Sequence, residues 1–165
     1  MWQLDNAALR LAATKLARRV KRDGGTLIVV GSPRTPADAW AIVRDAVGDS
    51  IHTAIVAKNE VRYPVLLADA DEHHVTADSV SMISEAVMTG KPVGLIAVEP
   101  DARGQRRIRG RSPETTNMRD PRRFWTDVQQ RGLVGTVDEP KAGEFDDPVE
   151  TAVAAIKSRL SGLFE

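Results

Sequence analysis

Apolar residues recur along this chain in two alternating patterns, short β-branched runs and longer stretches with helical spacing. Runs of strand length predict strands at 26–30, 51–57, 73–76 and 93–98, with a shorter one at 133–136. Stretches with apolar residues three and four apart predict helices at 5–22, 37–47, 63–70, 79–89, 121–130 and 148–163.

The regular alternation of strands and helices predicts the fold class. Strands joined through helices pair in parallel, because a helical crossover returns the chain to the same end of the sheet. We therefore expect an α/β fold with a Rossmann-like open, mostly parallel sheet and helices on both faces, a three-layer α/β/α arrangement. The run TLIVV at 26–30 has no polar alternation, which predicts a strand covered on both faces.

The stretch TADSVSMISEAVMTGKPV at 76–93 joins a strand, a polar turn and a helix that ends at Gly90. A helix amino terminus carries unpaired N–H groups and partial positive charge, so it attracts phosphate. We expect a nucleotide diphosphate site at this turn, formed by Asp78, Ser79, Val80, Ser81 and Glu85. Capping alone also explains serines at a helix start. Val80, Ile83, Val87 and Met88 are expected to form the packing stripe of this helix.

A second loop, GSPRTP at 31–36, follows the first strand and leads into a helix. Such loops lie at the carboxyl end of a parallel sheet, where α/β proteins bind ligands. We expect Ser32, Arg34 and Thr35 to face the same ligand, because a guanidinium matches phosphate geometry well. A plain connector is the alternative, with Thr35 capping the helix and Pro36 in its first turn.

Composition narrows the class of partner. The chain has 165 residues, which is enough for one domain. Its 23 basic side chains balance 23 acidic ones, so its charge favours neither nucleic acid nor an anionic membrane as a partner. Cysteine is absent, which excludes thiol chemistry and fits a reducing, cytoplasmic location. We expect no transmembrane segment. We also expect a domain excised from a longer protein.

Two further features bear on metal binding and on nucleic-acid binding. His73 and His74 are neighbours on a predicted strand and point to opposite faces, so they do not share a metal, and we expect none. The segment 99–120 contains five arginines between 103 and 111 and no apolar periodicity. Because no aromatic residues alternate with these arginines, a loop over an anionic ligand or a partner domain is favoured over RNA binding.

The chain resembles the ELM-type mitochondrial fission family, whose bacterial members are often labelled nucleoside-diphosphate-sugar epimerases. The resemblance rests on GTLIVV at 25–30, SPRTP at 32–36, YP at 63–64, LLA at 66–68, TADSVSMISEA at 76–86 and TGKPV at 89–93. It extends over nearly the whole chain and implies the carboxyl-terminal half of a two-domain protein. The family is similar to GT-B glycosyltransferases, whose second domain holds the sugar-nucleotide donor.

The resemblance implies roles for the candidate residues. Glu85 would bind the ribose, and the diphosphate would lie over Ser79, Val80 and Ser81, with Ser32, Arg34 and Thr35 closing from the first loop. The amino-terminal domain, which in GT-B enzymes shapes the acceptor side, is absent, so we expect this domain to bind a nucleoside-diphosphate sugar without turnover.

Two alternatives remain beside a sugar-nucleotide-binding domain. One is a non-catalytic scaffold that has kept the fold and acts through protein partners, because fold alone does not specify chemistry. The other, a nicotinamide-binding domain, is disfavoured because no G-x-G-x-x-G follows the first predicted strand.

Overall fold

The computed structural model describes residues 2–31, 35–49, 52–57, 62–100, 105, 121–144 and 148–161. Its strands are β1 (Trp2–Leu4), β2 (Leu27–Gly31), β3 (Thr53–Ala57), β4 (His73–Thr76), β5 (Val93–Ile96), β6 (Val98–Pro100) and β7 (Gly135–Thr136). Its helices are α1 (Asn6–Asp23), α2 (Ala37–Val47), α3 (Tyr63–Asp69), α4 (Val80–Val87), α6 (Arg122–Gln130) and α7 (Pro148–Ser161).

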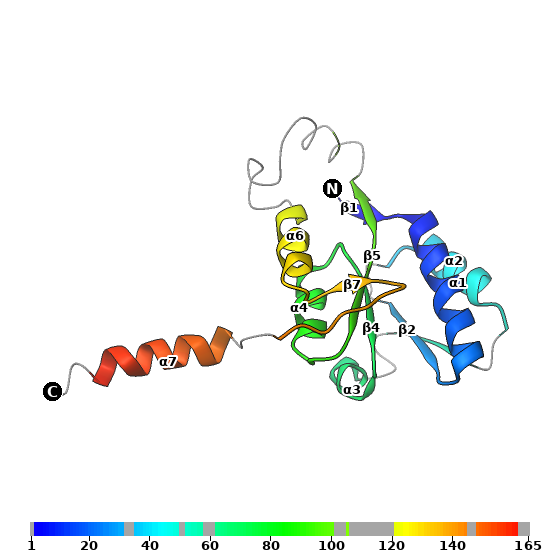
Figure 1. The fold of residues 1–165 in the computed structure, drawn as a ribbon. Helices are drawn as coiled ribbons and strands as arrows, with labels where there is room; N and C mark the ends of the chain where they lie inside the picture. The colour runs from blue at the N-terminus through cyan, green and yellow to red at the C-terminus, as the bar shows by residue number, and fades with distance from the viewer. Residues whose placement is uncertain are drawn as a thin grey trace.

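Parallel strands form the middle layer of the fold. β4, β5 and β7 pair in parallel in the order β4-β5-β7, and β2 pairs in parallel with β3. Figure 1 shows α1 and α2 on one side of these strands and α4 and α6 on the other. The Rossmann-like three-layer α/β/α class predicted from the sequence is therefore confirmed. Within the described residues, hydrogen bonding divides the layer into separate groups, with no ladder between β2 and β4.

The local sequence determines where the helix α1 begins and ends. Asp5 caps it, and its Oδ1 accepts hydrogen bonds from the backbone N–H groups of Ala7 and Ala8 at 2.9 and 3.1 Å. Gly24 ends it with a φ of 85°, a conformation that side chains with a Cβ rarely adopt. Helical spacing predicts an apolar face of Leu9, Ala12, Ala13, Leu16 and Val20; the first four are buried and Val20 is half-buried.

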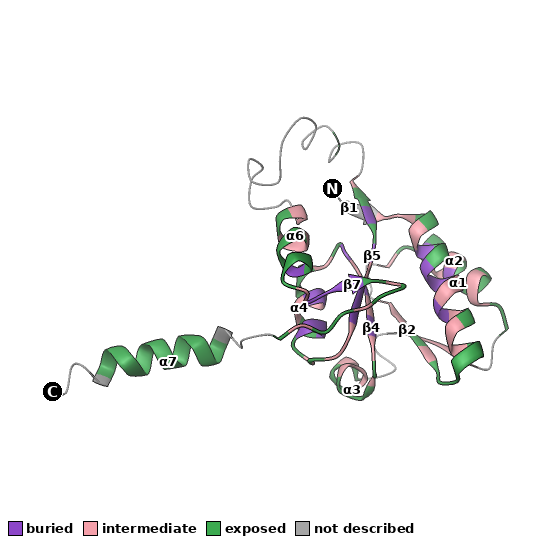
Figure 2. Ribbon diagram, in the orientation of Figure 1, coloured by how far each residue is buried: buried purple, intermediate pink, exposed green. Residues whose placement is uncertain are grey.

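Two apolar clusters hold the layers together (Figure 2). The larger joins α4, α6 and the β4-β5-β7 group, and its buried members are Val75, Ile83, Ala86, Val87, Val93, Val128, Leu133 and Val134. Phe124 and Trp125 of α6 are partly buried and pack against it. The smaller joins α1, α2, β2 and β3 around Leu9, Ala39 and Val43. Each fully buried aliphatic side chain contributes about 1.5–3 kcal/mol to folding.

The strand β1 was not predicted from the sequence, and the predicted end of β5 was wrong. We expected one strand at 93–98 and a loop from residue 99, but β5 ends at Ile96 and the chain continues into β6. β6 leaves the parallel ladder to pair antiparallel with β1, Val98 opposite Leu4 and Pro100 opposite Trp2. The arginine-rich part of the predicted loop lies outside the described residues.

The prediction that the 26–30 strand is covered on both faces is also wrong. The side chains of β2 are only half-buried, and Ile28 is 44% exposed. Val29 packs against the α1–α2 cluster, whereas the alternate face of β2 lacks an equivalent helix among the described contacts.

Within the described residues, no helix has both the length and the apolar character that crossing a bilayer requires.

Candidate functional site

The predicted site begins with the turn after β4, which three hydrogen bonds fix in place. The N–H of Ala77 donates to the carbonyl of Ile96 at 3.0 Å and so extends the β4–β5 ladder. The N–H of Ser79 donates to the carbonyl of Thr76 at 3.5 Å and closes the turn. From the other side, Trp125 Nε1 donates to the carbonyl of Ala77 at 2.9 Å. The turn is therefore held by β5 and α6 as well as by its own backbone.

The amino end of α4 follows directly from this turn. Ser79 is the N-cap, with extended φ and ψ of −120° and 98°, and its Oγ accepts from the N–H of Met82 at 3.4 Å. The N–H of Ile83 donates to the carbonyl of Ser79 at 3.1 Å and begins the helical ladder. The helix supplies no partner for the N–H groups of Val80 and Ser81, which lie in its first turn. These two groups are thus the donors with which α4 can meet an anion.

Most of the candidate side chains on this turn and helix are exposed. Asp78, Val80, Ser81 and Glu85 are exposed, and Ser79 is half-buried. Ser81 and Glu85 are four residues apart and therefore share one face of α4. The exposed face of α4 therefore carries the Ser81 hydroxyl in the first turn of the helix and the Glu85 carboxylate one turn later.

The packing stripe predicted for α4 is correct at Ile83 and Val87, which are buried, and wrong at its ends. Val80 is 42% exposed because it begins the helix beyond the end of β4. Met88 is 57% exposed, since it lies three residues after Glu85 and shares the outward face.

The charge of Glu85 also affects Tyr63, the first residue of α3. Burial raises the pKa of Tyr63, and the negative charge of Glu85 raises it further by disfavouring the phenolate. The Glu85 carboxylate therefore lies within electrostatic reach of the phenol ring at the start of α3.

The first predicted loop is only partly described. Ser32 and Arg34 lie outside the described residues, and Thr35 is half-buried. The expectation that Thr35 caps α2 is wrong: the N-cap is Pro36, in extended geometry and without a side-chain cap bond. Because Pro36 fixes its own φ near the required value, the helix begins at Ala37 without a capping hydroxyl.

The carboxyl ends of β2 and β4 lie at the same rim of the strand layer. Asn6 Nδ2 donates to Asp38 Oδ2 at 3.4 Å, so α1 and α2 begin side by side at this rim. At the other end of α1, the Arg19 guanidinium pairs with the carboxylate of Glu72, immediately before β4. β4 therefore enters the layer at the same end as β2, which follows the end of α1 (Figure 1).

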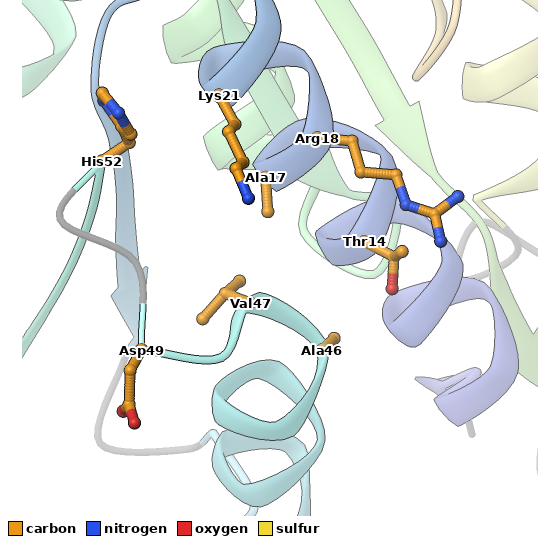
Figure 3. A pocket seen from close by; sticks show the side chains of 8 residues that line it. All are labelled: Thr14, Ala17, Arg18, Lys21, Ala46, Val47, Asp49 and His52. Carbon is orange, nitrogen blue, oxygen red and sulfur yellow. The ribbon is translucent and has the colours of Figure 1, made fainter.

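A cavity of about 480 Å³ lies at the opposite end of the layer, between the carboxyl ends of α1 and α2. It is lined by Thr14, Ala17, Arg18, Lys21, Ala46, Val47, Asp49 and His52. Figure 3 shows the Lys21 ammonium directed toward the gap between the helices, while the Arg18 guanidinium and the Asp49 carboxylate point away from it. The charged groups do not converge, so this cavity is an open groove rather than the predicted site.

The two strand histidines point to opposite faces, as predicted. His74 Nε2 contacts the carboxylate of Glu72, and Arg19 contacts both. His73 lies on the other face and is buried, so its ring packs within the layer. Among the described residues no group of three or more possible metal ligands occurs.

No local sequence pattern indicated Trp125 at the turn or Arg19 beside Glu72. Each contact joins residues about fifty positions apart, and short-range spacing does not encode such a pairing. The one signal for the first contact was the indole on the buried edge of the 121–130 helix, because a buried tryptophan N–H usually finds an acceptor.

The comparisons with known proteins agree with the sequence motifs. A family profile described as Mitochondrial fission ELM1 matches residues 1–113, which include both predicted loops and α4 but not α6 or α7. The match is shorter than the nearly complete coverage expected from the motifs. No curated protein and no solved structure matches the chain. Because the profile matches more than half of the chain, the chain belongs to the mitochondrial fission ELM1 family.

Proposed function

We propose that this domain binds a nucleoside diphosphate, as part of a sugar nucleotide, at the amino end of α4. The observation that carries the proposal is the geometry of the Ser79 cap. The Ser79 hydroxyl is used by the N–H of Met82, which leaves the N–H groups of Val80 and Ser81 directed out of the helix at an exposed rim. Two such donors at the positive end of a helix dipole bind phosphate oxygens well.

Glu85 supports the nucleoside part of this proposal. Its carboxylate is exposed on the same face of α4 as Ser81, and its negative charge raises the pKa of Tyr63. A carboxylate accepts hydrogen bonds from two neighbouring hydroxyls, which is the pattern that a ribose presents. A diphosphate at the helix start would place its ribose one helical turn further along, at Glu85.

The charge at the turn requires a cation beside the ligand. Asp78 is exposed at the same turn, and its carboxylate disfavours a second anion there. We assign the neutralising role to Arg34, with Ser32 and Thr35 as further donors, because these residues follow the carboxyl end of β2 in the sequence. A guanidinium binds two phosphate oxygens at once, which offsets the repulsion from Asp78.

In a GT-B-like protein this domain would hold the donor nucleotide, and a second domain would supply the acceptor. Donors aimed at a diphosphate stabilise it as a leaving group, because negative charge grows there in the transition state. The contribution of this domain to a glycosyltransferase or epimerase-like reaction would therefore be binding and leaving-group stabilisation.

Isothermal titration calorimetry of the 165-residue chain with UDP, GDP and UDP-GlcNAc tests the proposal. We expect saturable binding to at least one of these ligands, weakened at least tenfold in Glu85→Ala and in Arg34→Ala. Glu139→Ala, an exposed acid far along the chain from the turn, is the matched control and should bind like the parent. Absence of heat with all three ligands, in a chain shown to be folded by circular dichroism, would reject the proposal in favour of a scaffold.

A further inference from the structure

The indole of Trp40 lies outside both apolar clusters. Trp40 is half-buried in the first turn of α2, where its backbone N–H donates to the carbonyl of Pro36 at 3.4 Å. On the same helix Ala39 and Val43 belong to the α1–α2 cluster, and Ile42 packs against it. Trp40 is in neither cluster. Packing of the apolar core therefore does not account for the largest side chain of this helix.

The ring lies instead against the backbone of Gly31, the last residue of β2. A Cβ on Gly31 would overlap Cζ2 of Trp40 and would lie 2.7 and 2.9 Å from Cη2 and Cε2. Val29, two residues earlier on the strand, packs against the α1–α2 cluster, so the ring meets β2 on this same side of the layer (Figure 1). The absence of a side chain at residue 31 thus allows the indole to lie at the carboxyl end of β2.

The indole N–H of Trp40 is not used within the described part of the fold. Trp125 Nε1 donates to the carbonyl of Ala77, whereas no hydrogen bond among the described residues involves Trp40 Nε1. A tryptophan that serves packing alone usually finds an acceptor for this group when it is buried. The half-buried ring therefore brings both an apolar surface and an unused donor to the carboxyl end of β2.

We propose that Trp40 binds the sugar of the sugar nucleotide, an inference that rests on the proposed function. In that function the diphosphate lies at the amino end of α4 and the ribose at Glu85, on the α4 side of the strand layer. The sugar is attached to the other phosphate, so it extends away from Glu85 and across the strand ends toward α2. Trp40 lies on that side, at the rim where β2 and β4 both end.

An indole matches the chemistry of a pyranose ring. One face of a pyranose carries several C–H groups, and the face of an aromatic ring carries the negative charge density that attracts them. The indole N–H is a donor only, and sugar hydroxyls accept hydrogen bonds. The ligand class is thus a nucleoside diphosphate that carries a hexose, rather than a free nucleoside diphosphate.

Isothermal titration calorimetry of the full 165-residue chain with UDP and with UDP-GlcNAc tests the sugar contact. The two ligands share the nucleoside and the diphosphate, so the ratio of their affinities isolates the sugar. Trp40→Ala should weaken UDP-GlcNAc binding by about fivefold and leave UDP binding unchanged. GDP and GDP-mannose form a second pair that is measured in the same way. Equal losses for both members of a pair, or no loss for either, would overturn the proposal.

Ile42→Ala is the matched control for an indirect effect through α2. Ile42 is half-buried on the same helix and packs against the α1–α2 cluster, so its loss should lower stability without changing the ratio of the two affinities. A ratio that changes as much as in Trp40→Ala would show that the position of α2 is responsible, and would reject the direct contact. Gly31→Ala, whose Cβ displaces the ring, should lower the ratio as Trp40→Ala does, and an unchanged ratio would contradict the assigned position.

Tryptophan fluorescence reports the contact independently, because Trp40 is one of three tryptophans. UDP-GlcNAc should shift the emission more than UDP, and Trp40→Phe should abolish the difference. A difference that persists in Trp40→Phe would assign the change to another tryptophan and overturn the proposal. A folded parent that binds none of the four ligands would reject the proposed function and this inference with it, whereas a parent that binds UDP and UDP-GlcNAc equally would reject the sugar contact alone.

Discussion

The indole of Trp125 holds the turn that precedes α4, because its Nε1 donates to the carbonyl oxygen of Ala77 at 2.9 Å. Ala77 is buried, with 4% exposure, so water has little access to compensate for a lost bond. Trp125 belongs to α6, which packs on the same cluster as Ile83 of α4. The position of α4 at the rim thus depends on a helix that comes much later in the chain.

Replacing Trp125 with Phe should destabilise the domain. The variant keeps most of the ring packing but leaves the Ala77 carbonyl without its donor, a loss of about 1–3 kcal/mol for a buried acceptor. Urea unfolding measures the free energy of unfolding. Gln129→Ala, on the exposed face of the same helix, should change it by less than about 0.5 kcal/mol. Equal losses in the two variants would show that the hydrogen bond does not hold the turn.

Substitutions at Ser79 and Ser81 should distinguish a side chain that stabilises the fold from one that contributes to ligand binding. Ser79 caps α4 through its hydroxyl, so Ser79→Ala should lower the free energy of unfolding by about 0.5–2 kcal/mol. Ser81 is exposed and does not cap the helix, and Ala is a better helix former, so Ser81→Ala should leave stability unchanged or slightly raised. Urea unfolding distinguishes them. Under the proposed function the exposed Ser81 hydroxyl is a further donor to the phosphate beside its backbone N–H, so Ser81→Ala should still reduce nucleotide affinity when measured by calorimetry.

The elements that the sequence predicted well are those whose signal is local. The buried face of α1 follows from helical spacing, and the opposite orientations of His73 and His74 follow from strand geometry alone. Ile83 and Val87 were identified in the same way. Such patterns depend on residues within one or two turns of each other.

The features that the sequence did not reveal depend on distant pairing. β6 exists because Val98 pairs with Leu4, which lies near the start of the chain, and no run of apolar residues marks either strand. Val80 fits the helical period yet is exposed, because it lies beyond the end of the strand layer. For the candidate site, the capping serine was identifiable from its type and position, whereas Trp125, which fixes the turn, was not.

Lys91 should stabilise the fold by capping α3. Its Nζ donates to the carbonyls of Ala68 and Ala70 at 2.5 Å each, at the carboxyl end of that helix, where a cation also complements the helix dipole. Lys91→Met should therefore cost about 1.5–3 kcal/mol, as expected for bonds to a charged group, and Lys91→Arg should retain part of this energy. Thermal unfolding of the three proteins tests the order. A Met variant as stable as the parent would contradict the capping role.

Gly94 should tolerate no side chain. A Cβ at this position of β5 would lie 2.6 Å from Nδ1 of His74 and 2.6 Å from the carbonyl oxygen of Thr136, on both sides of a central strand. The backbone contact cannot move without breaking the β5–β7 ladder, so Gly94→Ala should destabilise by about 1–3 kcal/mol. Urea unfolding measures this loss. Gly94→Ala combined with His74→Ala should remain destabilised, because the Thr136 contact persists.

Stability should fall in mild acid because of the two strand histidines. Burial lowers the pKa of His73 and also that of His74, in the latter against the opposing effect of its bond to Glu72. Below the unfolded pKa of about 6.5 the unfolded chain therefore binds protons that the folded chain does not. The free energy of unfolding should thus decrease as the pH is lowered from about 7 to about 5.

Replacing either histidine with a residue that does not titrate should weaken the dependence of the free energy of unfolding on pH. His73→Leu replaces a buried imidazole with an apolar side chain, and His74→Gln keeps a donor for Glu72 without a titrating group. Urea unfolding at several pH values between about 5 and 7 should show a smaller slope in each variant than in the parent, because one fewer proton is taken up on unfolding. The carboxylates contribute equally to all three proteins, so the difference in slope isolates the histidines. Identical slopes would mean that neither imidazole is protonated on unfolding in this range.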